Sequence, residues 1–262
     1  MNEPHRSHFV RLIREGAATR DIHDSAGLGV YDVDPSPSTF ASDAFVSREL
    51  GRVAAHSRSL CPTLVDHVGS SKRVIDVGCG SGGTTVALAL SPLDAEEVIG
   101  VDANKAVLEA ATVRAFGYDL PPNRVRFLHV PAGAPLDFPT GYFDLATCVS
   151  ILEFITTEEA RRQFVAEIIR VVSHGGHIFL ATPSPFRLLE LHSRRLLGDW
   201  RKRPGYSWSS APWSIHAMFA GCDLIPLASY RLRRHRILRK VAWAAPLLGW
   251  AFPWQQFLFH KR

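Results

Sequence analysis

The ten residues Val74–Gly83 constrain the fold of this chain more than any other segment. They begin with β-favouring residues and pass into a loop that has glycines at positions 78, 80 and 82. Glycine lets the backbone turn sharply and approach a ligand that a Cβ atom would push away. A helix is expected to begin near Thr84, so that its free N–H groups face the same place. The segment therefore predicts a strand, a ligand-binding turn and a helix.

Asp76, next to the glycine turn, helps to decide which class of ligand the turn can bind. The spacing G-x-G-x-x-G over residues 78–83, with Asp102 further along the chain, also fits a dinucleotide site. In such a site the pyrophosphate lies at the helix N-terminus and the later acid holds a ribose. A carboxylate beside the loop would repel a pyrophosphate. It would attract a ligand that has an ammonium group and a ribose but no phosphate, such as S-adenosylmethionine.

Strands and helices are expected to alternate through the middle of the chain. The expected strands cover residues 73–77, 98–102, 125–129, 143–149 and 177–181, and the expected helices 83–90, 104–116 and 158–172. This succession implies a parallel sheet with right-handed crossovers, whose ligands bind outside the carboxyl ends of the strands. Further helices are expected over 9–14, from 42 onward, over 62–67 and over 214–220, and extended segments over 224–231 and 255–260.

Four segments, in order, resemble motifs of one enzyme family. Asp76–Gly82 resembles the first motif of the class I S-adenosylmethionine-dependent methyltransferases, and Gly100–Asp102 resembles their second. Phe143–Ser150 resembles their fourth-strand motif and Gly175–Leu180 the turn into their fifth strand. Four ordered motifs are far more specific than one glycine loop. The resemblance implies an α/β, Rossmann-like, seven-stranded sheet that is mostly parallel, with helices on both faces and an antiparallel C-terminal strand pair.

The resemblance also implies where the cofactor binds. The expected cofactor-binding residues follow the first four strands, and they are Asp76, Gly78, Cys79, Gly80, Gly82, Asp102, Ala103, Ala132, Val149 and Ser150. Asp76 is expected at the ammonium group and Asp102 at both ribose hydroxyls. Simpler interpretations stay open: a tight turn for the glycines, a helix N-cap for Asp102, and a plain buried strand end for Val149 and Ser150.

One position departs from the family's pattern. The family often has an acid after the third strand, which accepts a hydrogen bond from the adenine amino group. The matching residues here, Pro131–Gly133, include no acid. A backbone carbonyl or Asp137 would have to accept that bond instead. Because this acid is missing, one alternative stays open: a protein that binds the cofactor but does not catalyse methyl transfer.

The acceptor side is less constrained than the cofactor side. Methyl transfer depends on holding donor and acceptor in line and excluding water, and it needs a base only if the acceptor loses a proton. Glu153, just past the fourth strand, is the predicted catalytic residue, and it could equally cap the following helix. The other candidates on the family's substrate face are His23, Asp24, Tyr31, His192 and His216.

Two segments after residue 183 bear on the acceptor and on partners. Aromatic residues at 200, 206, 208 and 213 suit either a hydrophobic acceptor pocket or the core beneath a long loop. Residues 231–254 place a basic run before an apolar stretch that contains tryptophan. This order suits contact with an anionic membrane or a lipid-like substrate, whereas a solvated flank packed on the domain is the simpler interpretation. No nucleic acid is expected, because no binding motif accompanies the positive charge.

Composition is consistent with a folded domain. The chain has 262 residues, of which 46% are hydrophobic, and a net charge of +5. Its four cysteines lie far apart and predict neither a disulfide framework nor a metal site. The N-terminus lacks the apolar core of a signal peptide, and the apolar stretch 241–254 is too short and interrupted to span a bilayer. We therefore expect a cytoplasmic protein.

Together these features predict a single class I methyltransferase domain over residues 1–262. It divides into an N-terminal helical cap (1–70), a cofactor-binding core (71–183) and a substrate-side region with the last strands (184–262). The expected reaction moves the methyl group of S-adenosyl-L-methionine to an oxygen, nitrogen or carbon of a small hydrophobic acceptor, and releases S-adenosylhomocysteine. A catalytically silent cofactor-binding protein and a nicotinamide-dependent oxidoreductase are the alternatives.

Overall fold

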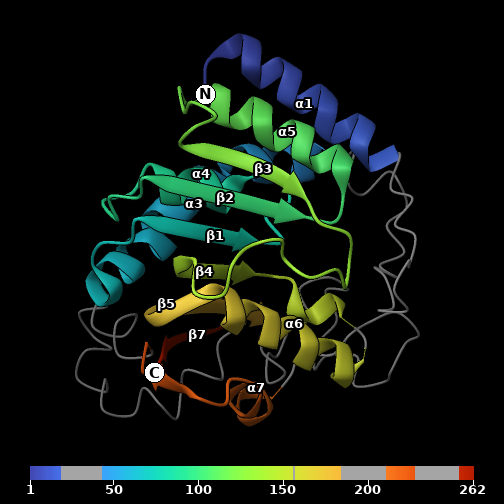
Figure 1. Ribbon diagram of the computed structural model, residues 1–262. Coiled ribbons are helices and arrows are strands. Elements are labelled where there is room, and N and C mark those ends of the chain that lie inside the picture. The colour runs from blue at the N-terminus through green and yellow to red at the C-terminus, as the bar shows by residue number, and fades with distance from the viewer. Residues whose placement is uncertain (19–42, 156, 184–210, 228–253) are drawn as a thin grey trace, which may run out of the picture.

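A seven-stranded sheet forms the centre of the computed structural model, which describes residues 1–18, 43–155, 157–183, 211–227 and 254–262 (Figure 1). The strands are β1 (Arg73–Val77), β2 (Glu97–Asp102), β3 (Val125–His129), β4 (Phe143–Val149), β5 (Val172–Pro183), β6 (Cys222–Ile225) and β7 (Trp254–Lys261). Their order across the sheet is β3-β2-β1-β4-β5-β7-β6. The pairs from β3 to β5 are parallel, and β7 runs antiparallel to both β5 and β6. The predicted mostly parallel sheet with an antiparallel C-terminal pair is confirmed.

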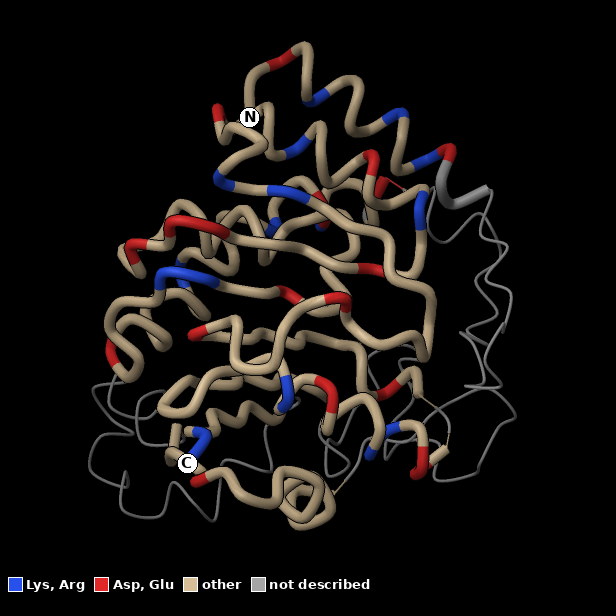
Figure 2. The backbone as a smooth tube through the Cα atoms, in the orientation of Figure 1, with Lys and Arg blue, Asp and Glu red and all other residues tan. Residues whose placement is uncertain are grey.

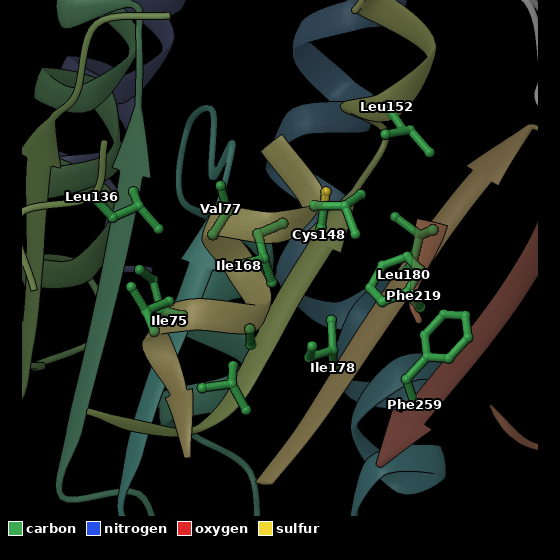
Figure 3. Close-up of a cluster of buried hydrophobic side chains, with 14 of the residues drawn as sticks. Ile75, Val77, Leu136, Cys148, Leu152, Ile168, Ile178, Leu180, Phe219 and Phe259 are labelled. Atoms are coloured by element: carbon green, nitrogen blue, oxygen red, sulfur yellow. The ribbon is translucent and has the colours of Figure 1, made fainter. Parts of the chain in front are cut away.

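Helices cover both faces of this sheet. The described helices are α1 (Glu3–Ala18), α3 (Asp43–Val68), α4 (Gly83–Ala89), α5 (Lys105–Phe116), α6 (Glu158–Val171) and α7 (Pro212–Met218), with a 3₁₀ turn η1 (Leu152–Phe154). In Figure 1, α3 and α4 lie behind the sheet and α6 lies in front of it. The two faces alternate along each strand, as the pleat requires. In β1, Val74 packs with residues of α3 and α4, whereas Ile75 packs with Ile168 of α6 (Figure 3).

The N-terminal helices extend the layer behind the sheet. α1 packs on α5, and α3 packs on α4. Phe9 and Ile13 of α1 form a small core with Val46 of α3 and Ala110 of α5. The charged residues of α1 before residue 16 are exposed and carry both signs (Figure 2). The amphipathic pattern of α1 therefore packs its apolar residues against α3 and α5.

The sequence predicted two helices where α3 is one. Pro62 was expected in the first turn of a new helix, but it lies inside α3, which continues to Val68. A proline inside a helix removes one hydrogen bond and disfavours continuation. Its neighbours Leu60, Cys61 and Leu64 are buried against α4 and the sheet. Their burial outweighs the local preference, since tertiary packing supplies most helical stability.

The turn expected before the fifth strand lies within β5. The pairing of β4 with β5 passes from Phe143 opposite Val172 to Leu145 opposite His177, so extra β5 residues bulge out between these two pairs. Gly175, in the bulge, has a φ of 78°. This left-handed conformation suits glycine, which has no Cβ. The turn residues were identified from the sequence, but they interrupt a strand that begins at Val172 instead of preceding it.

Candidate cofactor site

The glycine loop lies at the carboxyl ends of β1 and β2, next to the point where the strand order reverses between β1 and β4. Crevices at such points are where open α/β sheets bind ligands. The backbone N–H groups of Gly78 and Cys79 donate to the Val101 carbonyl oxygen, at 2.8 and 3.0 Å. The Gly80 N–H donates to Oδ2 of Asp102 at 2.8 Å. The end of β2 therefore fixes the course of the loop.

The three loop glycines are required for different reasons. All three have positive φ, at 73°, 51° and 75° for Gly78, Gly80 and Gly82. A Cβ atom on Gly78 would overlap Ile151, and one on Gly82 would lie 2.9 Å from Ala111 and Phe127. Apart from its chain neighbours, no atom of the described residues lies within 4 Å of a Cβ placed on Gly80. Gly78 and Gly82 are needed for packing, whereas none of the described side chains packs against the Cα of Gly80, where a ligand could approach the backbone.

Asp102 is half-buried and held by two backbone groups. Its Oδ2 accepts from Gly80, and its Oδ1 accepts from the N–H of Asn104 at 2.9 Å. Asn104, not Asp102, is the N-cap of α5, because its Oδ1 accepts from the N–H of Ala106 at 3.0 Å. The alternative of Asp102 as a helix cap is therefore wrong. A carboxylate offers about four lone-pair positions, so two N–H bonds do not prevent it from also accepting ribose hydroxyls.

Asp76 is buried, with only 1% of its surface exposed. Its Oδ2 accepts from the Thr85 hydroxyl at 2.6 Å, and its Oδ1 accepts from the Thr147 hydroxyl at 2.8 Å. Burial raises the pKa of Asp76 to about 6; the nearby charge of Asp102 also raises it, and the two threonine hydroxyls lower it. Asp76 thus connects β1 to α4 and to β4 through these hydrogen bonds. Its direct contact with a ligand ammonium group stays a prediction.

A non-glycine residue after the end of β4 also has a positive φ. Ser150 is not a glycine, yet it has a φ of 63°, and its N–H donates to the Ala181 carbonyl oxygen at 2.8 Å. Non-glycine residues rarely adopt this conformation, which concentrates at functional sites. Val149 and Ser150 are half-buried, which favours them as ligand neighbours over a plain buried strand end.

Three further predicted cofactor residues have different surroundings. Ala103 is exposed, and Ala132 is half-buried in the turn after β3. Cys79 is buried, and burial together with Asp102 and Asp76 raises the pKa of its thiol well above the ordinary value. The thiol therefore stays neutral and contributes packing to the loop. Within the described ranges, no group of three or more His, Cys, Asp or Glu side chains could hold a metal ion.

Glu153 lies in η1 and is buried. Its Oε2 accepts from the Thr182 hydroxyl at 3.2 Å. Thr157, not Glu153, caps α6, since its hydroxyl oxygen accepts from the N–H of Ala160 at 3.2 Å. The alternative of Glu153 as a cap of that helix is therefore wrong. The carboxyl end of β4 and the end of β5 hold this carboxylate on the same edge of the sheet as the glycine loop.

The other acceptor-side candidates are mostly not placed. His23, Asp24, Tyr31, His192 and the aromatics at 200, 206 and 208 lie outside the described residues. His216 is exposed on α7, and Trp213 is exposed beside it.

Some residues of the site were missed from the sequence. Thr85 and Thr147, the partners of Asp76, gave no signal because threonine is common in helices and strands alike. Glu49 of α3 accepts a hydrogen bond from the Ser81 hydroxyl in the glycine loop at 2.6 Å. A glutamate in a helical segment is usually exposed, so its burial beside the loop could not be inferred from its position in the sequence.

The glycine loop, β2 and β4 lie within a recognised domain. Residues 74–176 match the family described as a methyltransferase domain. These residues are a methyltransferase domain. This match supports the resemblance to the methyltransferases that the sequence motifs indicated. The nicotinamide alternative loses its support, because the glycine spacing that motivated it belongs to this domain.

Curated relatives match less than half of the chain. A ubiquinone biosynthesis O-methyltransferase from Psychrobacter arcticus is 32% identical over 113 residues, which are 43% of this chain and 41% of that protein. The uncharacterized methyltransferase YcgJ from Bacillus subtilis is 37% identical over 108 residues, 41% of this chain and 39% of that protein. The chain thus spans about two fifths of the length of these relatives.

Solved structures resemble a larger part of the chain. The crystal structure of YcgJ from Bacillus subtilis has a TM-score of 0.54 at 22% identity and covers 79% of this chain and 99% of that one. The [4+2]-cyclase SpnF has a TM-score of 0.53 at 20% identity and covers 82% and 93%. At these identities the likeness establishes the fold alone.

Gly80→Ala tests whether the open space beside the loop is the ligand site. Its control is Gly69→Ala, since Gly69 also has positive φ (72°) and no atom within 4 Å of an added Cβ. The backbone strain should lower the stability of both variants by about 1–2 kcal/mol. Calorimetry should show at least tenfold weaker binding of S-adenosylhomocysteine only for Gly80→Ala. Equal affinities in the two variants would contradict the placement of the ligand.

The raised pKa of Asp76 predicts a pH-dependent stability. Because the folded-state value of about 6 exceeds the ordinary 3.8, the folded protein loses stability as pH rises through this window. Asp76→Asn removes the titrating group. Relative to wild type, its free energy of unfolding should therefore rise by about 2 kcal/mol between pH 4 and pH 7, measured by urea unfolding. A difference that stays constant with pH would show that Asp76 is not desolvated as described.

Proposed function

We propose that the chain is an S-adenosyl-L-methionine-dependent methyltransferase that acts on a small hydrophobic acceptor and releases S-adenosylhomocysteine. The observation that carries this proposal is the open backbone at Gly80, beside the Asp102 carboxylate, in a methyltransferase domain. Because the curated relatives match only about two fifths of their length, the activity of the whole chain is inferred.

The residues at the strand ends fit this cofactor. Asp102 would accept from the ribose hydroxyls, and the Gly80 backbone would lie against the adenosyl group. Val149 and Ser150 would lie beside the methionine portion, with the buried charge of Asp76 nearby. When bound, the cofactor supplies an electrophilic methyl carbon. In the absence of an acid at Pro131–Gly133, a backbone group of this turn would accept from the adenine amino group.

We propose Glu153 as the base that takes a proton from the acceptor. The Thr182 hydroxyl fixes its carboxylate at the edge of the sheet where the glycine loop lies. A base is needed for a hydroxyl acceptor, and the relatives named ubiquinone biosynthesis O-methyltransferases favour oxygen as the methylated atom. The region expected to shape the acceptor pocket, 184–262, lies beyond the matched domain.

Contact with a membrane or a lipid-like substrate through residues 231–254 stays a prediction, since residues 231–253 lie outside the described ranges. Among the helices that the structure describes, none is both long and apolar enough to cross a membrane. The division of the chain into a helical cap, a cofactor core and a substrate-side region likewise stays a proposal, as does a cytoplasmic location.

Binding and turnover must both be measured, because one fold can host different reactions, as the cyclase with the same fold illustrates. Calorimetry should show binding of S-adenosylmethionine and S-adenosylhomocysteine, and not of NAD. Release of S-adenosylhomocysteine should follow with some member of a panel of small aromatic hydroxyl compounds. Binding without release across the panel would favour a catalytically silent protein. Binding of NAD alone would overturn the proposal.

Glu153→Gln should separate catalysis from cofactor binding. Loss of a general base should lower kcat about 100-fold, while the affinity for S-adenosylhomocysteine changes less than about twofold. Glu109→Gln is the control, since Glu109 is an exposed glutamate on α5. If Glu153→Gln retains full kcat, Glu153 is not the base, and the acceptor needs none or uses another group.

A further inference from the structure

A buried carboxylate of α3 contacts the glycine loop. Glu49 is 4% exposed, and its Oε2 accepts from the Ser81 hydroxyl at 2.6 Å. Ser81 is itself buried and follows Gly80 directly. A hydroxyl that donates to a charged carboxylate makes a short bond, about twice as strong as a neutral one. The loop is thus joined to a helix that lies outside the matched methyltransferase domain.

Two arginines hold this carboxylate in place. Arg52 pairs with Oε1 of Glu49 through Nη2. Arg114 of α5 is 1% exposed, lies with Nη2 3.8 Å from Oε2 of Glu49, and donates to the Glu49 carbonyl oxygen at 2.7 Å. Its guanidinium also lies over the ring of Phe9 in α1, 4.3 Å from the ring centroid. Residues of α1, α3 and α5 therefore converge beside the loop.

The network keeps Glu49 charged. Burial alone would raise its pKa, but Arg52, Arg114 and the Ser81 hydroxyl lower the pKa below its ordinary value overall. The nearby His56 adds no charge at neutral pH, because burial first, and then the positive charge of Arg52, lower its pKa to about 4. Two guanidiniums thus face one carboxylate, and the ionised form of Glu49 is the one that binds Ser81.

The same arginines pack directly against the loop backbone. A Cβ atom on Gly83 would lie 2.5 Å from Cδ of Arg52 and 2.7 Å from Nη1 of Arg114. Gly80 is held by Asp102 of β2, and the adjacent Ser81 is held by Glu49 of α3. Two neighbouring loop residues are therefore each held by a carboxylate from a different element.

We propose that Glu49 is a positioning residue for the cofactor: it holds Ser81, and through it the Gly80 backbone, in the conformation that binds the adenosyl group. The proposal rests on the proposed function. Under this proposal, α3 supports the cofactor site through Glu49, although the N-terminal helices contribute no residue to the glycine motif of the family. A purely structural network would instead stabilise the fold and leave cofactor affinity unchanged.

Ser81→Ala is the decisive variant, because it removes the hydroxyl and keeps the ion pairs of Glu49 intact. Calorimetry should show about tenfold weaker binding of S-adenosylhomocysteine, because the variant loses one charge-assisted hydrogen bond that holds the loop. The KM for S-adenosylmethionine should rise by a similar factor with kcat unchanged. Ser59→Ala is the matched control, since the Ser59 hydroxyl donates to the Ala55 carbonyl oxygen on the exposed side of α3. It should leave both quantities unchanged.

A double-mutant cycle tests the role of Glu49 itself. In a Glu49→Gln background, Ser81→Ala should weaken binding by less than about twofold, because the charged acceptor is already gone. If Glu49→Gln does not fold, Ser81→Ala alone decides the proposal.

Two outcomes would overturn the proposal, and they are distinguishable. If wild type binds S-adenosylhomocysteine and Ser81→Ala binds it equally well but melts at a lower temperature, the network is structural only and the proposed function stands. If wild type does not bind S-adenosylhomocysteine, the proposed function fails and this proposal fails with it.

Discussion

The hydrogen bond from the Gly80 N–H to the Asp102 carboxylate is the interaction on which the candidate site depends. It ties the first crossover of the sheet to the end of the second strand, and it fixes the acid that is expected to hold the ribose. The Val101 carbonyl oxygen holds the two preceding loop residues in the same way. Because the sheet places these strand ends side by side, the loop and the acid hold each other in position.

Electrostatics favours a positively charged ligand over a diphosphate. The charge of Asp102 contributes to the raised pKa of Asp76, so the two carboxylates share one electrostatic environment. A sulfonium or ammonium group would relieve their repulsion, whereas a phosphate would add to it. The negative charge of Glu49, which contacts the loop at Ser81, is paired with Arg52 and Arg114. This charge is therefore not available to attract a cationic ligand. We therefore propose separate roles for these acids: Asp76 and Asp102 act on the cofactor, and Glu49 supports the loop backbone.

The sequence predicted the parts that depend on local pattern. β1, β3 and β4 begin and end at the predicted residues, because short apolar runs between turns specify buried strands. The prediction failed where tertiary packing decides: α3 continues through Pro62, and the turn expected before the fifth strand lies within β5. The bond between Glu49 and Ser81 joins residues far apart in sequence, and no motif spans them. Contacts of this kind depend on how helices pack, which a single sequence does not record.

A crystal structure of the protein with S-adenosylhomocysteine would test the central claim most directly. The account predicts both ribose hydroxyls within hydrogen-bond reach of the Asp102 carboxylate, at about 3 Å, and the adenosyl group against the Gly80 backbone. A ligand bound elsewhere, or a ribose turned away from Asp102, would contradict the assignment of the glycine loop as the cofactor site.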